Sequence, residues 1–299
     1  MSNKSLIIRR IVIFCVLAFL PLIIVTPLLN MYYGELIFVS EKAAAGSYVF
    51  GLLGMMSPAA ANLLTRLITK EGMKNSFLAL DLKGKGRYYT AAILTVPAEG
   101  LLGIILFCVF FMNGMSLTVI FPAEGLADKS ATLLFQISYS VVVFFPAFGE
   151  EFGWRGYLMP KLCEVMSKPA AVVVGGVIWG LWHAPLTISG HNFGVDYPLY
   201  PWLGILLMCI ICVAENAFLT LLTESTGSVF PASFYHMVNN NCAIPTIIGI
   251  FGSEAAIAVA DNIPSIQAAL MILFIPLAIV GTVSFVLLMR KGRVRENSI

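Results

Sequence analysis

The sequence predicts an all-α membrane protein, a bundle of about eight transmembrane helices with a polar cavity inside the membrane. The chain of 299 residues is 59% hydrophobic and only 11% charged, whereas soluble domains carry about 25% charge. The apolar residues gather into runs of about 20, the length that crosses a bilayer as a helix. Within these runs lie a few carboxylates, imidazoles and amides, which membrane bundles bury only against one another or a wet cavity.

Eight apolar runs define the predicted helices, and they leave no room for a separate soluble domain. We therefore treat residues 1–299 as one integral-membrane domain. The first run resembles a signal peptide but lacks a small-residue cleavage site after it, so it is kept as a helix. Ser57-Pro58 lies inside the second run and predicts a kink there. The runs are Ile11–Leu29, Tyr48–Ile68, Tyr89–Met112, Leu133–Leu162, Ala170–Ile188, Trp202–Leu222, Val229–Ile250 and Ile266–Met289.

The distribution of Lys and Arg predicts the orientation of the bundle. With both termini placed in the cytoplasm, only Lys42 and Lys129 of the 18 basic residues fall outside. This is a strong positive-inside bias, and it agrees with an even number of helices. A net charge of +2 gives no indication of nucleic-acid binding. The six cysteines fall mostly in apolar runs, which favours small core residues over disulfides or a metal site.

The fourth run ends in two adjacent carboxylates, Glu150 and Glu151, and ionisable groups at membrane depth usually mark a functional site. Glu151 and Arg155 are four residues apart and can pair on one helical face. Glu150 is turned about 100° away and lacks that cation. A helix that began at Leu133 would carry Glu150 to the cytoplasmic face. Glu150 could not then meet His183, which lies deeper in the membrane. The two residues can meet if the helix begins nearer Ser138 and continues to about Leu162.

Two further polar pairs lie on later helices. Trp179 and His183 are four residues apart, as are His236 and Asn240, so each pair points to one side of its helix. Single histidines in apolar helices are more often hydrogen-bonded core residues than catalysts. Two of them together with a carboxylate pair and an amide favour a shared site. Glu215 could line that cavity, accept from Arg155, or be a buried structural partner.

These three motifs, in this order on separate helices, resemble the CPBP family of intramembrane endopeptidases, which includes the type II CAAX prenyl endopeptidases and bacteriocin-processing and self-immunity proteins. The motifs span residues 148–240, and the protease-like core is expected at roughly 131–250. The segment from Pro58 to Leu67 also resembles the upstream part of bacterial members. Trp179 stands where the family usually has Phe, and because it is also a large apolar ring we expect little effect on the chemistry.

The resemblance implies an endopeptidase that cleaves membrane-associated protein or peptide substrates in the lipid bilayer of a bacterial cell. Glu150 would be the base that activates water, and His183 would hold that water. His236 and Asn240 would stabilise the oxyanion. Glu151, Arg155 and Trp179 would support the site structurally, and no cofactor would be needed.

Two alternatives remain open at this point. A zinc ion held by His183, His236 and either Glu150 or Glu151 could carry out the same hydrolysis. The sequence lacks the His-Glu-x-x-His spacing that places two ligands on one helical turn. The polar cluster could also serve a non-enzymatic immunity, binding or transport protein, although no internal repeat of the kind found in many transporters is present.

Overall fold

The computed structural model describes residues 3–80, 82–111, 126–251 and 274–296. Within these ranges every regular element is a helix, apart from one isolated bridge between Leu78 and Ser228. Each of the eight predicted apolar runs overlaps one helix or two or three consecutive helices, so the predicted fold class is confirmed. The predicted boundaries at Met112 and Ile266 lie outside the described residues.

The first two runs form α1 (Asn3–Tyr33), followed by α2 (Ala44–Gly54) and α3 (Ser57–Ile68). The second run is interrupted at Met55 and Met56, directly before the predicted Ser57-Pro58 kink. Proline is tolerated at this place because the first helical residues have no intrahelical hydrogen-bond partner for their N–H groups. The break brings the chain close to the carboxylate motif, as the packing of α3 shows below.

The third run forms α4 (Gly86–Phe111), and the fourth forms α6 (Leu126–Gly153) with its continuation. After Gly153 the helix widens into a π-helical turn, η1 (Trp154–Leu158), and resumes as α7 (Met159–Val165). The prediction that the helix continues past the carboxylates to about Leu162 agrees with this. The predicted start near Ser138 is wrong, because the helix begins a further three turns upstream, at a polar segment that hydropathy does not recognise as a helix.

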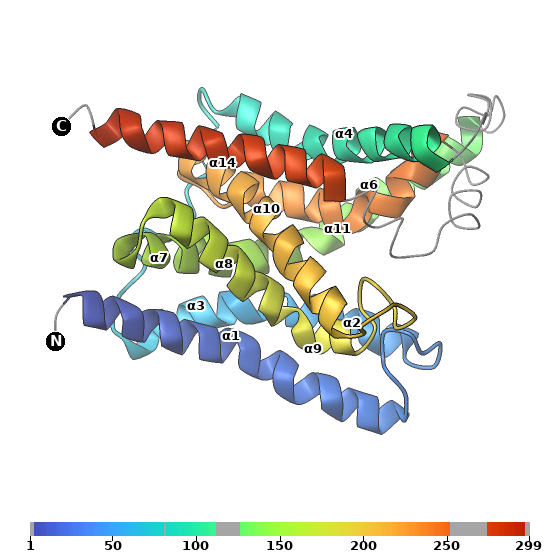
Figure 1. Ribbon diagram of the computed structural model, residues 1–299, viewed down its shortest axis with the longest axis horizontal. Coiled ribbons are helices and arrows are strands. Elements are labelled where there is room, and N and C mark those ends of the chain that lie inside the picture. The colour runs from blue at the N-terminus through green and yellow to red at the C-terminus, as the bar shows by residue number, and fades with distance from the viewer. Residues whose placement is uncertain (1–2, 81, 112–125, 252–273, 297–299) are drawn as a thin grey trace.

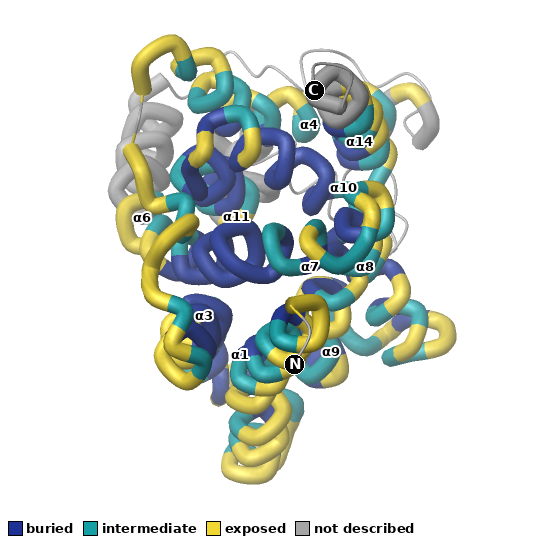
Figure 2. Tube along the Cα trace, turned by 90° about the vertical axis from the view of Figure 1, so that its left-hand side faces the viewer, coloured by how far each residue is buried: buried dark blue, intermediate teal, exposed yellow. Residues whose placement is uncertain are grey.

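The second half of the chain packs around one central helix. The helix α10 contacts α8, α14 and α11, while α11 also packs against α6 and α4. Figure 2 shows the bundle from the end at which the termini lie. Most described residues of α3 and α11 are buried in this view, and α1 lies at the edge of the bundle. These helices are α8 (Lys168–Trp182), α9 (Ala184–Ile188), α10 (Trp202–Thr226), α11 (Phe230–Phe251) and α14 (Ile275–Glu296).

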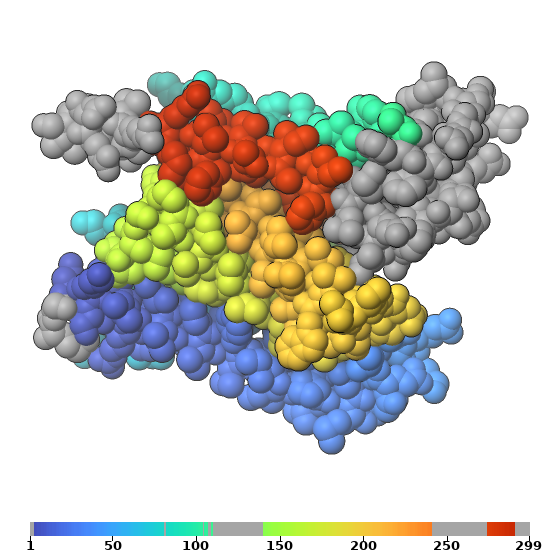
Figure 3. All heavy atoms as spheres, viewed as in Figure 1, coloured from blue at the N-terminus to red at the C-terminus, as the bar shows by residue number. Residues whose placement is uncertain are grey.

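Small residues allow these helices to approach closely. A Cβ atom on Gly176 would lie 2.4 Å from the Cα of Val213, and one on Gly180 would lie 2.4 Å from the Cα of Cys209. The glycines are four residues apart on α8, so they form one smooth face against α10. Membrane helices pack in this way because lipid supplies no hydrophobic force between them and close contact must provide the attraction. Figure 3 shows α8, α10 and α14 fitted together on one face.

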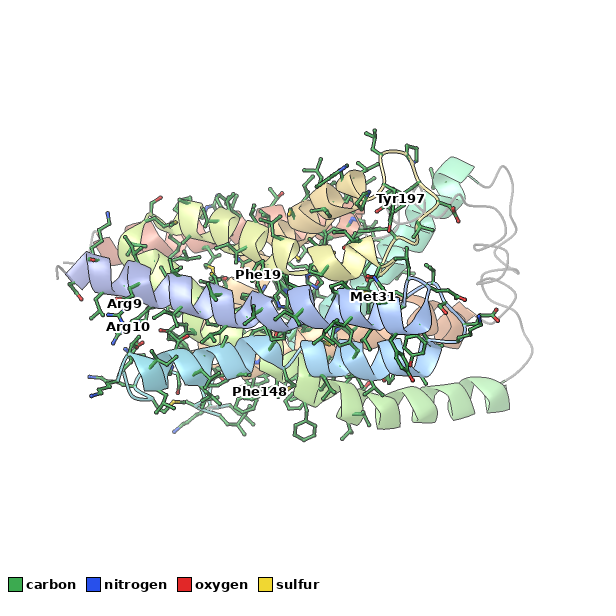
Figure 4. The ribbon with its side chains drawn as sticks, turned by 90° about the horizontal axis from the view of Figure 1, so that it is seen from below. Arg9, Arg10, Phe19, Met31, Phe148 and Tyr197 are labelled. Carbon is green, nitrogen blue, oxygen red and sulfur yellow. The ribbon has the colours of Figure 1, made fainter. Side chains whose placement is uncertain are left out.

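Four helical segments in the described part of the chain are long and apolar enough to cross a membrane. The start of α1 and the end of α14 lie at the same end of the bundle (Figure 1). Arg9 and Arg10 mark that end, whereas Met31 and Tyr197 lie toward the other (Figure 4). The cysteines with described side chains, Cys15, Cys163, Cys209 and Cys212, are all free thiols.

Candidate active site

The two carboxylates lie in the last turn of α6, directly before the π-helical turn. Glu150 is 2% exposed and Glu151 is fully buried. They therefore lie inside the protein and not among lipid headgroups. Buried carboxylates at this depth are tolerated only when other groups hydrogen-bond to them, so their partners show how the site is built.

Glu151 is the paired carboxylate. Its Oε1 accepts a hydrogen bond from Nη1 of Arg155 at 3.0 Å, so the predicted i, i+4 ion pair is present. The same oxygen lies 2.7 Å from Nδ1 of His236 on α11, a contact that the sequence did not predict. The guanidinium of Arg155 also stacks on the Trp179 ring, 4.1 Å from its centroid. Glu151 and Arg155 thus join α6, α8 and α11 at one point.

Glu150 has no cation but two neutral donors. Its Oε2 accepts hydrogen bonds from the indole N–H of Trp179 at 2.8 Å and of Trp154 at 3.2 Å. The expectation that Trp179 acts only as an apolar ring therefore omits a contact to the candidate base. Trp154 was not identified from the sequence, although its spacing of four residues from Glu150 was a readable signal.

His183 lies at the C-terminal end of α8 and is 8% exposed. Its Nδ1 lies 2.9 Å from the backbone carbonyl oxygen of Trp179. Because a carbonyl oxygen can only accept, Nδ1 carries the proton in the neutral ring and Nε2 is left as an acceptor. The rings of Trp179 and Trp182 flank the imidazole, with centroids at 6.0 and 4.8 Å.

Asn240 is the outlying member of the predicted set. Its side chain is exposed, and its Nδ2 lies 3.8 Å from the sulfur of Met55 at the break between α2 and α3. The neighbouring Asn239 is partly buried and donates to Oε1 of Glu215 at 2.9 Å. The structure therefore brings Glu150, Glu151, Trp179 and His236 into contact, and it places Asn240 beside them on α11 without a contact to either carboxylate.

The upstream segment that resembles bacterial members of the family supports the motif from α3. The amide of Asn62 donates to the backbone carbonyl of Phe152 at 2.8 Å, and Nε of Arg66 donates to Oδ1 of Asn62 at 2.7 Å. Phe152 lies next to the π-helical turn, where regular helical hydrogen bonding is disturbed. Turns of this kind occur frequently at functional sites. Here the turn carries Trp154, which contacts Glu150, and Arg155, which contacts Glu151.

The same residues can be considered as metal ligands. Among the described residues, no group of three or more His, Cys, Asp and Glu side chains is arranged to hold a metal ion. Oxygens of both glutamates are engaged, Oε2 of Glu150 by two indoles and Oε1 of Glu151 by Arg155 and His236. One oxygen of each glutamate is therefore already used in a hydrogen bond, and Nδ1 of His236 faces Glu151.

The fold and this site define a polytopic helical membrane protein with a buried carboxylate–imidazole centre. Residues 132–242 match the family described as "Type II CAAX prenyl endopeptidase Rce1-like", a region that includes every predicted site residue. The chain thus carries an Rce1-like domain, and the family resemblance drawn from the motifs is confirmed.

A curated relative supports the same assignment. The chain is 27% identical over 94 residues to a protein named CAAX prenyl protease 2 from Methanococcus maripaludis. This match covers 30% of the chain and 34% of that protein, so it spans about a third of the relative's length.

Proposed function

We propose that this protein is an intramembrane endopeptidase that hydrolyses peptide bonds of membrane-associated proteins or peptides, with Glu150 as the base. The proposal rests on the different hydrogen-bond partners of two adjacent buried carboxylates. Glu151 is bound to a cation, whereas Glu150 is held only by the neutral N–H groups of Trp154 and Trp179. A carboxylate that no cation neutralises is free to take up and release a proton.

In the proposed reaction, Glu150 removes a proton from water while the water oxygen attacks the scissile carbonyl carbon. Nε2 of His183, the acceptor left by the hydrogen bond at Nδ1, accepts from the same water and orients it. Collapse of the tetrahedral intermediate breaks the C–N bond, and Glu150 returns its proton to the departing amine. General acid–base catalysis of this kind contributes about 10²–10⁴-fold to a rate.

His236 and Asn240 would stabilise the oxyanion from one face of α11. Nδ1 of His236 lies against the Glu151 carboxylate, and a neighbouring anion favours the ring that carries protons on both nitrogens. In that form, Nε2–H of His236 would donate to the substrate oxygen. The Asn240 amide, four residues later, supplies a second donor. Donors that are held in place before the reaction are effective because they need no reorganisation when charge develops.

We further propose that no metal is required. The amide of Asn240 suits an oxyanion donor and is a poor zinc ligand, since zinc prefers thiolate, imidazole or carboxylate. The alternative assigns zinc to His183, His236 and one glutamate. The indole donors occupy Oε2 of Glu150, and Arg155 and His236 occupy Oε1 of Glu151, so a metal would bind the other oxygen of one carboxylate.

The test is cleavage of a tagged membrane-proteome library by the purified protein and by Glu150→Gln. We expect the variant to unfold at the wild-type temperature and to lose at least about 100-fold in cleavage, as loss of a general base predicts. Glu164→Gln is the matched control, because Glu164 forms only a half-exposed pair with Lys161, and it should retain full activity.

Other outcomes would change the assignment. Activity of Glu150→Gln within about tenfold of wild type would remove Glu150 as the base. If no peptide is cleaved by the wild-type protein, the binding, immunity or transport alternative stands instead. Cleavage is also measured after treatment with a chelator, which tests the need for a metal. If activity is lost on chelation and restored only by added zinc, the metal-free mechanism is wrong.

A further inference from the structure

The helix α11 carries two polar pairs that point in different directions. His236 and Asn240 form one pair, and Tyr235 and Asn239 form the other. Each pair is spaced by four residues, and the two pairs are offset by a single residue, so their faces are about 100° apart on the helix. Because both pairs lie on one rigid helix, contacts that fix Tyr235 and Asn239 also fix the direction in which His236 and Asn240 point.

Two carboxylates hold that second pair, the partly buried Glu99 and the buried Glu215. The hydroxyl of Tyr235 donates to Oε2 of Glu99 on α4 at 3.3 Å, and the amide of Asn239 donates to Oε1 of Glu215 on α10 at 2.9 Å. Glu215 is 6% exposed. Carboxylates are costly inside a membrane bundle, and neither of these two has a place in the proposed reaction.

Glu215 and its neighbour together connect the two helices that carry the site. The next residue, Asn216, donates from Nδ2 to the backbone carbonyl of Val172 on α8 at 2.7 Å. One dipeptide of α10 is thus hydrogen-bonded to α11, which carries His236 and Asn240, and to α8, which carries Trp179 and His183. The sequence left open whether Glu215 accepts from Arg155, and the hydrogen bond goes to Asn239 instead.

We propose that Glu215 is a positioning residue: its hydrogen bond with Asn239 sets the rotation of α11 about its axis. The hydrogen bond between Glu99 and Tyr235 fixes the same rotation at a second point. This rotation directs His236 and Asn240 toward the substrate oxygen. This inference rests on the proposed peptidase function. Side-chain atoms lie about 6 Å from a helix axis, so a rotation of about 10° moves them by about 1 Å. A misplacement of that size can lower a rate by about 100-fold.

The test compares two substitutions of one residue. Glu215→Gln keeps an oxygen that can accept the hydrogen bond from Asn239. Glu215→Leu removes that oxygen but keeps a side chain of similar size. We expect Glu215→Leu to lower kcat at least about tenfold with KM within about threefold, because the oxyanion forms only after substrate has bound. Glu215→Gln should keep kcat within about threefold of wild type.

A double-mutant cycle connects the effect to the contact. Asn239→Ala removes the other half of the hydrogen bond and provides a second variant should Glu215→Leu fail to fold. If the two residues act as a unit, the double variant should be about as slow as either single variant. Equal losses in Glu215→Gln and Glu215→Leu, additive losses in the cycle, or an unchanged kcat in Glu215→Leu would each overturn the inference.

Glu150→Gln measured in the same assay separates the two proposals. If cleavage depends on Glu150 and Glu215→Leu has wild-type kcat, only the positioning role fails. If cleavage is absent or independent of Glu150, the proposed function fails and the positioning role with it.

Discussion

At the scale of single residues, Arg155 is the least exposed Lys or Arg in the described part of the chain. It is 1% exposed, pairs with Glu151 through Nη1 and stacks on Trp179. Its Nε and Nη2 have no hydrogen-bond partner among the described residues, and it lines a cavity of about 90 Å³ together with Thr220 and Thr223. A cavity of that size with unsatisfied donors is suited to ordered water. Because the pair is buried, removal of either partner would leave an uncompensated charge.

A second charged residue, Glu71, lies outside the spans, in the connection between α3 and α4. It contacts Arg10 of α1 at 3.3 Å, Lys161 of α7 at 2.7 Å and the hydroxyl of Tyr157 at 3.0 Å. Partial burial opposes ionisation of Glu71, but the hydrogen bonds from Lys161 and Tyr157 and the charges of Lys161 and Arg10 outweigh it and lower its pKa below the usual 4.5.

This lowered pKa predicts a pH-dependent contribution to stability. The contribution is fully present above pH 4.5 and disappears as the pH falls through the folded-state pKa, since the unfolded chain then binds the proton more readily. Glu71→Gln should therefore unfold at a lower temperature than wild type at pH 7, and the difference should shrink in acid. Thermal unfolding of the solubilised protein across pH measures this.

The control for Glu71 is Glu164→Gln. Glu164 pairs with the same Lys161 at 2.9 Å but is 44% exposed, and exposed pairs contribute little to stability. It should differ from wild type by much less at pH 7. A Glu71→Gln variant as stable as wild type at neutral pH would show that the three contacts contribute nothing.

At the scale of elements, the contact between α3 and α6 positions the carboxylates. A Cβ atom on Gly153 would lie 2.3 Å from Cβ of Pro58 and 2.5 Å from its carbonyl carbon. One on Gly149 would lie 2.6 Å from the sulfur of Met56. These glycines are four residues apart and flank Glu150 and Glu151. The break between α2 and α3, directly before Pro58, therefore packs against the helical turn that carries the two carboxylates.

We therefore expect Gly153→Ala to be disruptive. Backbone atoms of α3 cannot move aside cheaply, so α3 and α6 must separate. Both unfolding temperature and cleavage should fall, cleavage by at least about tenfold because small displacements at a site are costly. Gly51→Ala on α2 is the matched control, since nothing lies within 4 Å of its added methyl group. Alanine favours helix there, so stability should be unchanged or slightly higher.

The result for Gly153 is informative in both directions. A normal unfolding temperature with reduced cleavage would show that the close approach serves alignment more than stability. A Gly153→Ala protein that matches Gly51→Ala in both measurements would contradict the packing argument.

At the scale of the whole molecule, the ends of α1 and α14 lie on the same side of the bundle (Figure 1). Arg9 and Arg10 lie there too (Figure 4). Positive charge accumulates on cytoplasmic sides of membrane proteins. We infer that both termini are cytoplasmic.

Reporter fusions at the two termini check this orientation. Reporters active only in the cytoplasm should be active at both ends, and reporters that require export should be silent at both. A fusion at the short loop near Lys42, predicted to lie outside, provides the opposite signal as a control. An exported C-terminus would refute the orientation.

The described elements show where hydropathy was sufficient and where it was not. The kink at Pro58 and the continuation of α6 past Glu151 could be predicted, since both follow from local rules of helix formation and membrane length. The start of α6 at Leu126 could not, because its first turns are polar and carry no hydropathy signal. The π-helical turn after Gly153 also has no known local signature in this sequence.

The sequence by itself determined the fold class and the i, i+4 pairing of Glu151 with Arg155, because helical periodicity and apolar length are local properties. The order of its motifs also showed the family resemblance. Only the tertiary structure decided that Trp154 and Trp179 together hold Glu150, that His236 is directed at Glu151, and that Asn239 binds Glu215 while Asn240 is left exposed. Spacing selects a face of a helix, but the neighbour of that face depends on how the helices rotate and cross. Those rotations depend on close contacts such as Gly153 against Pro58, which join residues far apart in the chain.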